Sequence, residues 1–247
     1  VADCQYEVEN FPYQALTKSV GSMMNECTLA LAQGLNGMAF NALGLWETDL
    51  QPFEEIARRA HEYRPVWEQL LRHAHGLPTA GLWIAWTPWL MARRAVRPGE
   101  NWFSFEGGYN YMRTRVLAEI GLPLCVDRPG SATVLHGRVA ETFDENELRT
   151  MLSGGVIMDT EALDVLVQRG LDKLVGVRRV RQYDNGVVER FSSDSLNAGM
   201  EGQLRDARIE FWGNARGMAD VLESTVPGVR VLAVLEDYFH RPLGPCL

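Results

Sequence analysis

The chain opens with a short segment in which polar and apolar positions alternate. Within residues 4–9, Gln5, Glu7 and Glu9 lie between apolar or aromatic neighbours, and Pro12 follows. A period of two is typical of a β-strand that turns one face to a core and the other to polar surroundings. The pattern predicts a strand with its carboxylates on one face, ended by the proline.

The following residues change to a helical period and then repeat the order of strand and helix. Apolar side chains recur every three or four positions after a cap at Thr17 or Ser19, until Gly34 closes the segment. A short strand is predicted at 38–43, and a second helical face runs over 53–74. Strand, helix, strand, helix is the repeating unit of parallel α/β folds.

The segment LPTAG, residues 77–81, separates this region from a new apolar stretch. Proline and glycine interrupt regular structure, and the second helix is expected to end just before them, near Gly76. We therefore predict two domains, residues 1–76 and residues 80–247.

The best-specified local feature of the second domain is a helix start. Asp144 and Glu147 have the spacing of a capping box, and Phe143 and Leu148 flank it as a hydrophobic staple. Short strands and helices alternate around it, which predicts an open parallel sheet. The strands are expected at 132–136, 156–158 and 174–177, and the helices at 109–120, 144–153 and 159–170.

Beyond residue 178 the pattern loosens. Residues 181–191, RQYDNGVVERF, resemble a hairpin because Asp-Asn-Gly lies between β-prone flanks. A helix is predicted over 213–224 and a strand over 229–237.

Composition narrows the class of protein. The 247 residues are 46% hydrophobic and carry a net charge of −8, so we expect a folded, soluble chain for which nucleic acid is an unfavourable partner. No apolar run reaches the roughly 20 residues that a membrane span needs. Because the chain starts at Val1 rather than Met, we expect a piece of a longer protein, with the cytoplasm favoured and export left open. Four cysteines, far apart and without metal-binding spacing, predict reduced, mostly buried thiols and no metal site: Cys4, Cys27, Cys125 and Cys246.

Glu7 and Glu9 end the first predicted strand, where barrel enzymes carry their catalytic groups. Glycoside hydrolysis needs two carboxylates that flank the scissile bond of a sugar. Alternate residues of one strand lie roughly 7 Å apart and project from the same side, so these two cannot form the pair. We predict that Glu9, nearer the carboxyl end, is one half of a pair whose partner precedes Val1. The alternative is a solvated Glu9 without a catalytic role.

Three segments resemble one family of enzymes. EVENFPY and ALAQGLNGMAFNALG resemble the seventh and eighth strands of the (β/α)8 barrel in β-galactosidase-like glycoside hydrolases of the A4 type. ELRTMLSGGVIMDTEALDVLVQRGLDKLVGV resembles the class I glutamine-amidotransferase-like, flavodoxin-like domain that follows this barrel. The resemblance covers residues 3–180, and LSGGVIMD is its most specific part. Phe40-Asn41-Ala42 departs from the Trp-Arg ending usual for the eighth strand, which leaves the sugar and linkage open.

The resemblance implies the C-terminal part of a (β/α)8 barrel over residues 1–76 and a flavodoxin-like open parallel sheet over residues 80–247. It implies a retaining hydrolase of carbohydrate with Glu9 as nucleophile, an acid/base residue upstream of Val1, no cofactor, and a homo-oligomer, a trimer. The chain alone is expected to be inactive. A non-catalytic carbohydrate-binding or oligomerisation module is the alternative.

The amidotransferase-like domain raises a rival hypothesis of glutamine hydrolysis by a cysteine. That chemistry needs a cysteine at a strand-to-helix elbow, activated by a histidine. Cys125 lies in PLCVDRPG without a glycine elbow, and His136 ends a strand without an acid or nucleophile in register. We therefore predict that this domain serves interaction or acts as a lid.

Three residues are candidate contacts for the substrate. Trp46 follows the eighth strand, where an aromatic ring can stack on the apolar face of a sugar, and Tyr13 follows the seventh. Asn41 is placed either to bond a sugar hydroxyl or to cap a turn. A spacing of three suits a helix face or a loop plug, so core packing is predicted for Trp83, Trp86 and Trp89.

Overall fold

The structure, a computed structural model, describes residues 3–10, 17–42, 49–78, 80–101, 114–125, 132–184, 186–206 and 218–246. It is a mixed α/β protein with parallel and antiparallel sheets. The chain divides into two compact units, Val1–Thr79 and Ala80–Leu247, and the division falls inside the LPTAG segment. No described helix combines the length and the apolar character needed to traverse a lipid bilayer.

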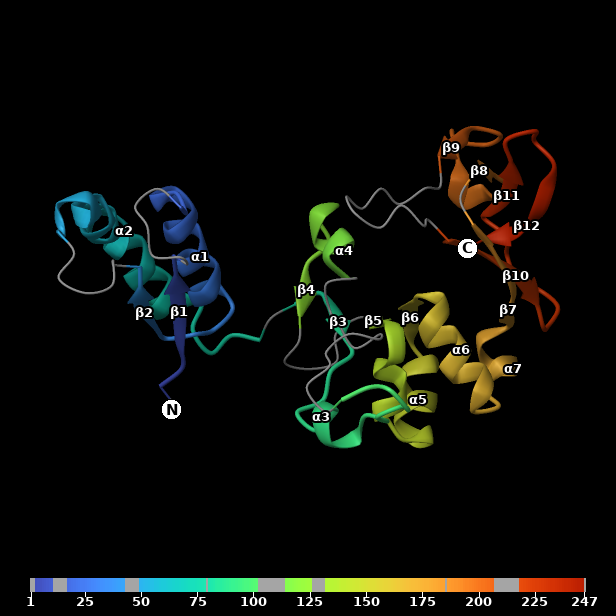
Figure 1. Cartoon of the computed structure of the whole chain (residues 1–247), viewed down its shortest axis with the longest axis horizontal. Coiled ribbons are helices and arrows are strands. Elements are labelled where there is room, and N and C mark those ends of the chain that lie inside the picture. Colours follow the sequence, from blue (N-terminus) through green and yellow to red (C-terminus); the bar gives the residue numbers. More distant parts are fainter. Residues whose placement is uncertain are drawn as a thin grey trace. The chain divides into compact units, whose positions relative to one another are not determined.

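In the first unit each strand is followed by a helix (Figure 1). β1 and β2 pair in parallel, with Gln5 opposite Gly37 and Glu9 opposite Asn41. The predicted order of strand, helix, strand and helix is confirmed. The elements are β1 (Gln5–Glu9), α1 (Val20–Ala32), β2 (Gly37–Asn41), the 3-10 turn η1 (Gln51–Phe53) and α2 (Glu54–His73).

Both helices contribute to one core with the apolar face of β1. Val8 is fully buried and packs in a cluster with Met23 of α1 and Trp67 of α2. The Trp67 indole N–H donates to Thr28 Oγ1 at 2.9 Å and links the two helices. Burial of each large apolar side chain contributes about 1.5–3 kcal/mol, so this cluster is the main source of stability in the unit.

The second unit begins with a four-stranded, all-parallel sheet. Numbered by their order along the chain, its strands lie side by side in the order 2-1-3-4, because the first two exchange places. The strands are β3 (Leu82–Ile84), β4 (Leu124–Cys125), β5 (Ala132–Leu135) and β6 (Gly155–Met158). The helices are α3 (Leu90–Arg93), α4 (Arg115–Glu119), the 3-10 segment η3 (Gly137–Thr142), α5 (Glu145–Leu152), α6 (Thr160–Gln168) and α7 (Asp172–Val175).

Side-chain hydrogen bonds cap the first turns of α1 and α5. Ser19 rather than Thr17 caps α1, since its hydroxyl accepts the Ser22 N–H at 3.1 Å. The capping box of α5 is confirmed, because Asp144 accepts the Glu147 N–H at 2.8 Å and the Glu147 carboxylate accepts the Asp144 N–H at 2.7 Å. Such caps satisfy backbone donors that helix geometry leaves unpaired.

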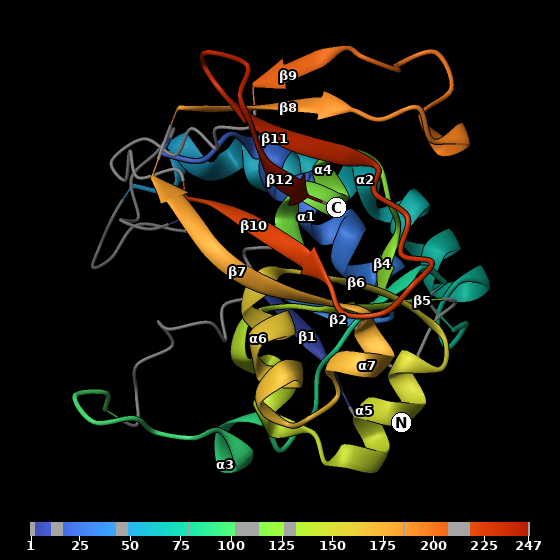
Figure 2. The ribbon, with the colours of Figure 1, turned by 90° about the vertical axis from the view of Figure 1, so that its right-hand side faces the viewer.

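The rest of the second unit consists of antiparallel strands. Val187, Val221 and Leu235 form a core that joins two sheets, and β10 and β12 lie side by side (Figure 2). One sheet pairs β7 with β10, and the other has the order β12-β11-β8-β9. The bounds are β7 (Val177–Asp184), β8 (Val187–Phe191), the 3-10 turn η4 (Ser195–Asn197), β9 (Leu204–Asp206), β10 (Met218–Ser224), β11 (Ala233–Asp237) and β12 (Pro242–Cys246).

Three predictions for this region are wrong. The hairpin over 181–191 does not form, because β7 and β8 belong to different sheets and β7 pairs with the distant β10. The helix over 213–224 is strand β10 in its described part, where Leu222 packs against Leu163 and Val177. The strand over 174–177 is interrupted by Gly176, whose φ of 77° ends α7 before β7 begins. The parallel sheet predicted for the whole second domain is therefore confined to β3–β6.

The three tryptophans do not share one environment. Trp83 lies in β3 and is buried, whereas Trp86 and Trp89 are 50% and 62% exposed. Core packing is thus wrong for the last two. The reason is that β3 ends at Ile84 and α3 begins only at Leu90, so a spacing of three residues does not place them on one helix face.

Candidate functional site

The polar face of β1 and β2 forms an open surface in the first unit. Alternation along β1 turns Val8 into the core and leaves Glu7 and Glu9 exposed on the other side. The parallel register places Glu9 opposite Asn41 and Glu7 opposite Ala39. The last pair, Glu9 and Asn41, therefore lies where both strands reach their carboxyl ends, which is the edge that carries catalytic groups in α/β barrels.

The residue after Glu9 holds this strand end in place. Asn10 is 1% exposed, and its side-chain oxygen accepts the backbone N–H of Lys18 at 2.9 Å. Its own N–H donates to the carbonyl oxygen of Asn41 at 3.3 Å. Asn10 thus connects the carboxyl end of β1 both to β2 and to the start of α1. Asn10 was not among the predicted site residues. Its position directly after the predicted strand is the sequence feature that could have indicated this role.

A second set of contacts anchors β1 from the core side. Lys18 forms an ion pair with Glu26 of α1 at 3.0 Å, and the Tyr6 hydroxyl donates to the same carboxylate at 3.3 Å. Burial raises the pKa of the Tyr6 hydroxyl, and the negative charge of Glu26 adds to the effect. The neutral phenol is therefore retained as a donor, and it fixes the face of β1 opposite to the carboxylates.

Asn41 was predicted either to bond a sugar hydroxyl or to cap a turn, and in the structure its side chain has a different partner. Its amide nitrogen donates to Glu7 Oε1 at 3.3 Å, across the strand pair. This contact orients the Glu7 carboxylate and holds the Asn41 amide at the surface of the sheet. The other two predicted substrate contacts, Tyr13 and Trp46, lie outside the described residues.

The cysteine chemistry of the rival hypothesis finds little support in the second unit. Cys125 is 2% exposed in β4, and its thiol lies 3.8 Å from the carbonyl oxygen of Gly81. His136 is also buried, at the end of β5. A nucleophilic cysteine requires access to its substrate, and this buried thiol lacks that access.

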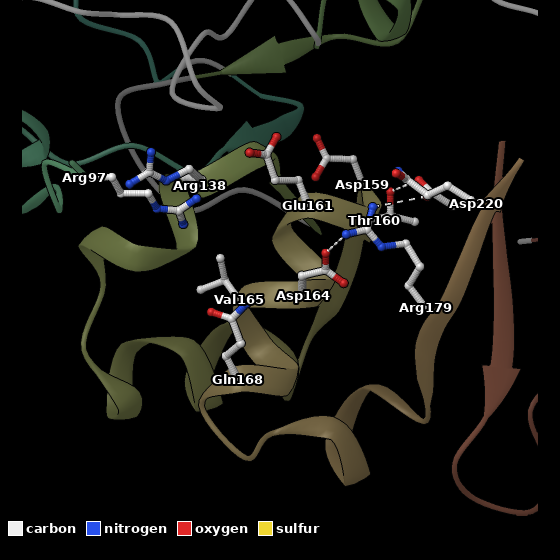
Figure 3. A pocket seen from close by; sticks show the side chains of 11 residues that line it. Arg97, Arg138, Asp159, Thr160, Glu161, Asp164, Val165, Gln168, Arg179 and Asp220 are labelled. Atoms are coloured by element: carbon white, nitrogen blue, oxygen red, sulfur yellow. Dashed lines mark hydrogen bonds and ion pairs between the residues drawn. The ribbon is translucent and has the colours of Figure 1, made fainter. Parts of the chain in front are cut away.

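A polar pocket of about 520 Å³ lies at the carboxyl ends of β5 and β6 (Figure 3). Arg138 follows β5 and Asp159 follows β6, while Arg179 and Asp220 reach the pocket from β7 and β10. Open parallel sheets bind ligands at this edge. The pocket is therefore the second candidate site.

The charges of this pocket are largely paired with one another. Arg179 forms ion pairs with Asp164 and with Asp220, the latter at 3.2 Å, and Asp220 also accepts from Gln182 at 2.8 Å. Burial raises the pKa of the Asp164 carboxyl even though the Arg179 guanidinium opposes the shift. Arg179 therefore joins α6 to strands β7 and β10, and its guanidinium is already engaged.

Arg138 is engaged in the same way on the other wall. It is 2% exposed and contacts Glu100 at 2.6 Å and Glu141 at 3.0 Å. Its guanidinium also donates to the carbonyl oxygen of Ala95 at 2.8 Å. A buried charge needs such partners, so this wall is a structural ion cluster.

Nowhere in the described ranges do three or more His, Cys, Asp or Glu side chains gather in a way that could hold a metal ion. Comparison of the chain with protein-family models, with curated proteins and with solved structures gave no match. Conclusions about function therefore depend on the sequence pattern and on the geometry described above.

Proposed function

We propose that the chain is part of a retaining glycoside hydrolase of the β-galactosidase-like class, with Glu9 as the catalytic nucleophile. One observation carries the proposal: Glu9 is exposed beside Asn41 at the carboxyl ends of two adjacent parallel strands. The resemblance of EVENFPY to a seventh barrel strand gives this carboxylate the same role.

The two faces of the strand pair support a barrel. In a (β/α)8 barrel, helices cover the outside of every strand and the alternate side chains point to the inside. α1 and α2 pack with Val8 on one face, and the other face carries Gln5, Glu7 and Glu9. In this proposal β1–α1–β2–α2 is the last quarter of the barrel, and the exposed polar face is its interior.

The strand order of the second unit supports the flavodoxin-like part of the proposal. Flavodoxin-like sheets have the parallel order 2-1-3-4-5, and β4-β3-β5-β6 follows its first four places. Because no cysteine stands at a predicted strand-to-helix elbow, we propose that this domain does no amidotransferase chemistry. On the family resemblance, it contributes to a homo-oligomer, a trimer. Exposed apolar side chains on and next to α4, Val116 and Ile120, offer surface for such contacts.

The proposed reaction uses Glu9 as an ionised carboxylate. Its oxygen attacks the anomeric carbon and forms an ester bond to the sugar, while the bond to the leaving oxygen breaks and a second carboxylic acid protonates that oxygen. Water then cleaves the ester and restores Glu9. The second acid must lie about 5–5.5 Å away. In this proposal it comes from the fourth strand of the barrel, and Asn41, Tyr13 and Trp46 contact the sugar.

Mechanism-based labelling tests this assignment. The protein encoded by the complete reading frame is incubated with 2,4-dinitrophenyl 2-deoxy-2-fluoro-β-galactoside, digested with trypsin and sequenced by mass spectrometry. Glu9 attacks, dinitrophenolate leaves, and the fluorinated sugar stays attached because its second step is slow. We expect the label on Glu9, within the peptide that ends at Lys18.

Two variants sharpen the test. Glu9→Gln is expected to abolish labelling and to lower kcat on aryl galactosides by at least about a thousandfold, because an amide cannot supply the attacking oxygen. Glu7→Gln, one pleat further from the strand end, is the matched control and is expected to keep labelling at Glu9. A label on Glu7, or wild-type turnover by Glu9→Gln, would contradict the proposal. Sugar binding without labelling or hydrolysis would favour the non-catalytic module.

A further inference from the structure

A second cleft, of about 610 Å³, lies on the parallel sheet of the second unit, away from the paired charges of Figure 3. Its walls come from β3 and the loop after it, from α5, and from the first residues of β5 and β6. This volume is within the range of pockets that hold small ligands. The side chains that matter for recognition are Trp83, Trp86, Phe143 and Asn146.

The described lining offers no partner to an anionic ligand. Among the described residues that border the cleft there is no Lys, Arg or His to neutralise a phosphate or a carboxylate. Its two carboxylates, Asp144 and Glu147, are already used in the capping box of α5, and Glu147 also pairs with Arg93 at 3.2 Å. A neutral ligand is left as the class that fits.

Two side chains of this cleft have a hydrogen-bonding group without a partner among the described residues. The indole N–H of Trp83 is one of them, but this atom is closed to solvent, in a side chain that is 7% exposed, so a ligand in the cleft does not reach it directly. The side-chain amide of Asn146 forms no hydrogen bond within the described part of the chain and lies exposed on the first turn of α5.

The cleft also presents an aromatic surface. Trp86 borders it with half of its surface exposed, and Trp83 and Phe143 pack edge to face with ring centres 6.2 Å apart. Aromatic rings beside an exposed side-chain amide suit a ligand that has both apolar C–H faces and hydroxyl groups. Neutral sugars have this character, whereas a nucleotide or an acidic peptide does not.

We infer that this cleft binds a neutral saccharide, with Trp86 stacked on a pyranose face and with the Asn146 amide bonded to its hydroxyl groups. Its described lining residues all belong to the Ala80–Leu247 unit, whereas Glu9 belongs to the other unit. It would hold a carbohydrate chain without cleaving it. The inference does not require the proposed hydrolase to be correct.

Titration of the full chain with oligosaccharides tests the inference. The probes are β-1,4-galactotetraose, cellotetraose and xylotetraose, and binding is measured by calorimetry and by saturation-transfer NMR. We expect at least one of them to bind with a Kd of about 1 mM or lower. The assignment would be overturned if none of the three oligosaccharides bound. It would also be overturned if a proline-rich peptide bound instead and the oligosaccharides did not displace it.

Two tryptophans of the same loop give a matched pair of variants. Trp86→Ala is expected to weaken binding by about tenfold or more because the stacking surface is lost. Trp89→Ala removes an exposed ring of the same kind that does not border the cleft, and it should change the Kd by less than about twofold. Circular dichroism checks that both fold. Equal effects of the two, or none of Trp86→Ala, would refute the site.

Asn146→Ala and Glu9→Gln complete the design. Asn146→Ala tests the polar contact and is expected to weaken binding by about fivefold. Glu9→Gln should leave the affinity at this cleft unchanged. If Glu9→Gln alone abolished binding, the saccharide would occupy the first unit, and the cleft assignment would be wrong. Failure of the labelling experiment at Glu9 would leave these results intact.

Discussion

Arg138 shows how a single buried charge can organise a loop region. Its guanidinium is held by the carboxylates of Glu100 and Glu141 and by the carbonyl oxygen of Ala95. Glu141 lies in η3, as Arg138 does, whereas Ala95 and Glu100 lie in a segment about 40 residues earlier in the chain. Removing the charge would take the guanidinium partner from Glu100 and would leave Glu141 paired with Arg97 alone, in a partly buried setting.

We expect Arg138→Met to lower the free energy of unfolding of the second unit by about 3 kcal/mol. Urea denaturation followed by circular dichroism measures it. Arg97→Met is the control, since Arg97 pairs with the same Glu141 at 2.6 Å but is half exposed, and its loss should cost less than about 1 kcal/mol. Similar losses for the two variants would show that burial does not set the difference.

At the scale of residues, local sequence patterns predicted some features of the candidate sites and missed others. The strand period of two placed Glu7 and Glu9 on one face, and that prediction is confirmed. The bond from Asn41 to Glu7 and the role of Asn10 depend on how two strands pair across 30 residues, which no local pattern encodes. The segment WTPW contains Trp86, but its spacing of three residues was interpreted as a helix face or a loop plug and therefore as core packing.

At the scale of elements, glycines decide where two helices of the second unit end. Gly170 and Gly176 both adopt positive φ, 72° and 77°. A β-carbon on Gly170 would meet no atom within 4 Å, whereas one on Gly176 would lie 3.1 Å from Val226 and 3.2 Å from Val229. The two sites therefore share the backbone strain and differ in packing.

This pair yields a quantitative expectation. Gly170→Ala should lower the free energy of unfolding by about 1 kcal/mol, because a β-carbon strains the backbone in the left-handed conformation. Gly176→Ala should lose about 1 kcal/mol more, since both valines must move. Equilibrium denaturation of the two proteins measures the difference. If Gly170→Ala proved the more damaging, the steric account would be wrong.

Elements with local determinants were predicted well, and those with distant ones were not. The helices α1, α5 and α6 have side-chain caps and apolar stripes within their own sequence, and α2 has an apolar stripe. β7 and β10 pair across about 40 residues, and the Arg178–Glu223 contact at 2.9 Å that crosses them is invisible in either segment alone. A local turn signal at Asp-Asn-Gly favoured the nearer strand, but burial of Leu222 favours the distant one.

For the whole molecule, the important feature is that each described core cluster lies within one unit. The cluster around Val8 and Trp67 belongs to the first, and those around Leu148, Leu163 and Val221 belong to the second. Each described core cluster therefore stabilises the unit in which it lies.

We expect two separate unfolding transitions in calorimetry of the chain. Trp67→Ala should lower the midpoint of one transition and Leu148→Ala that of the other, each by several degrees, because a large buried side chain costs about 2–5 kcal/mol when truncated. A single transition lowered equally by both variants would show that the units unfold together.

The boundary at residues 77–81 also has a consequence for the history of the gene. A recombination event there would separate the coding sequences of the two units without dividing any described core cluster. Crossovers within either unit would instead combine halves of cores that were selected apart. The two units can therefore be inherited from different ancestors, and each can be exchanged between genes while the other keeps the side chains that its own core requires.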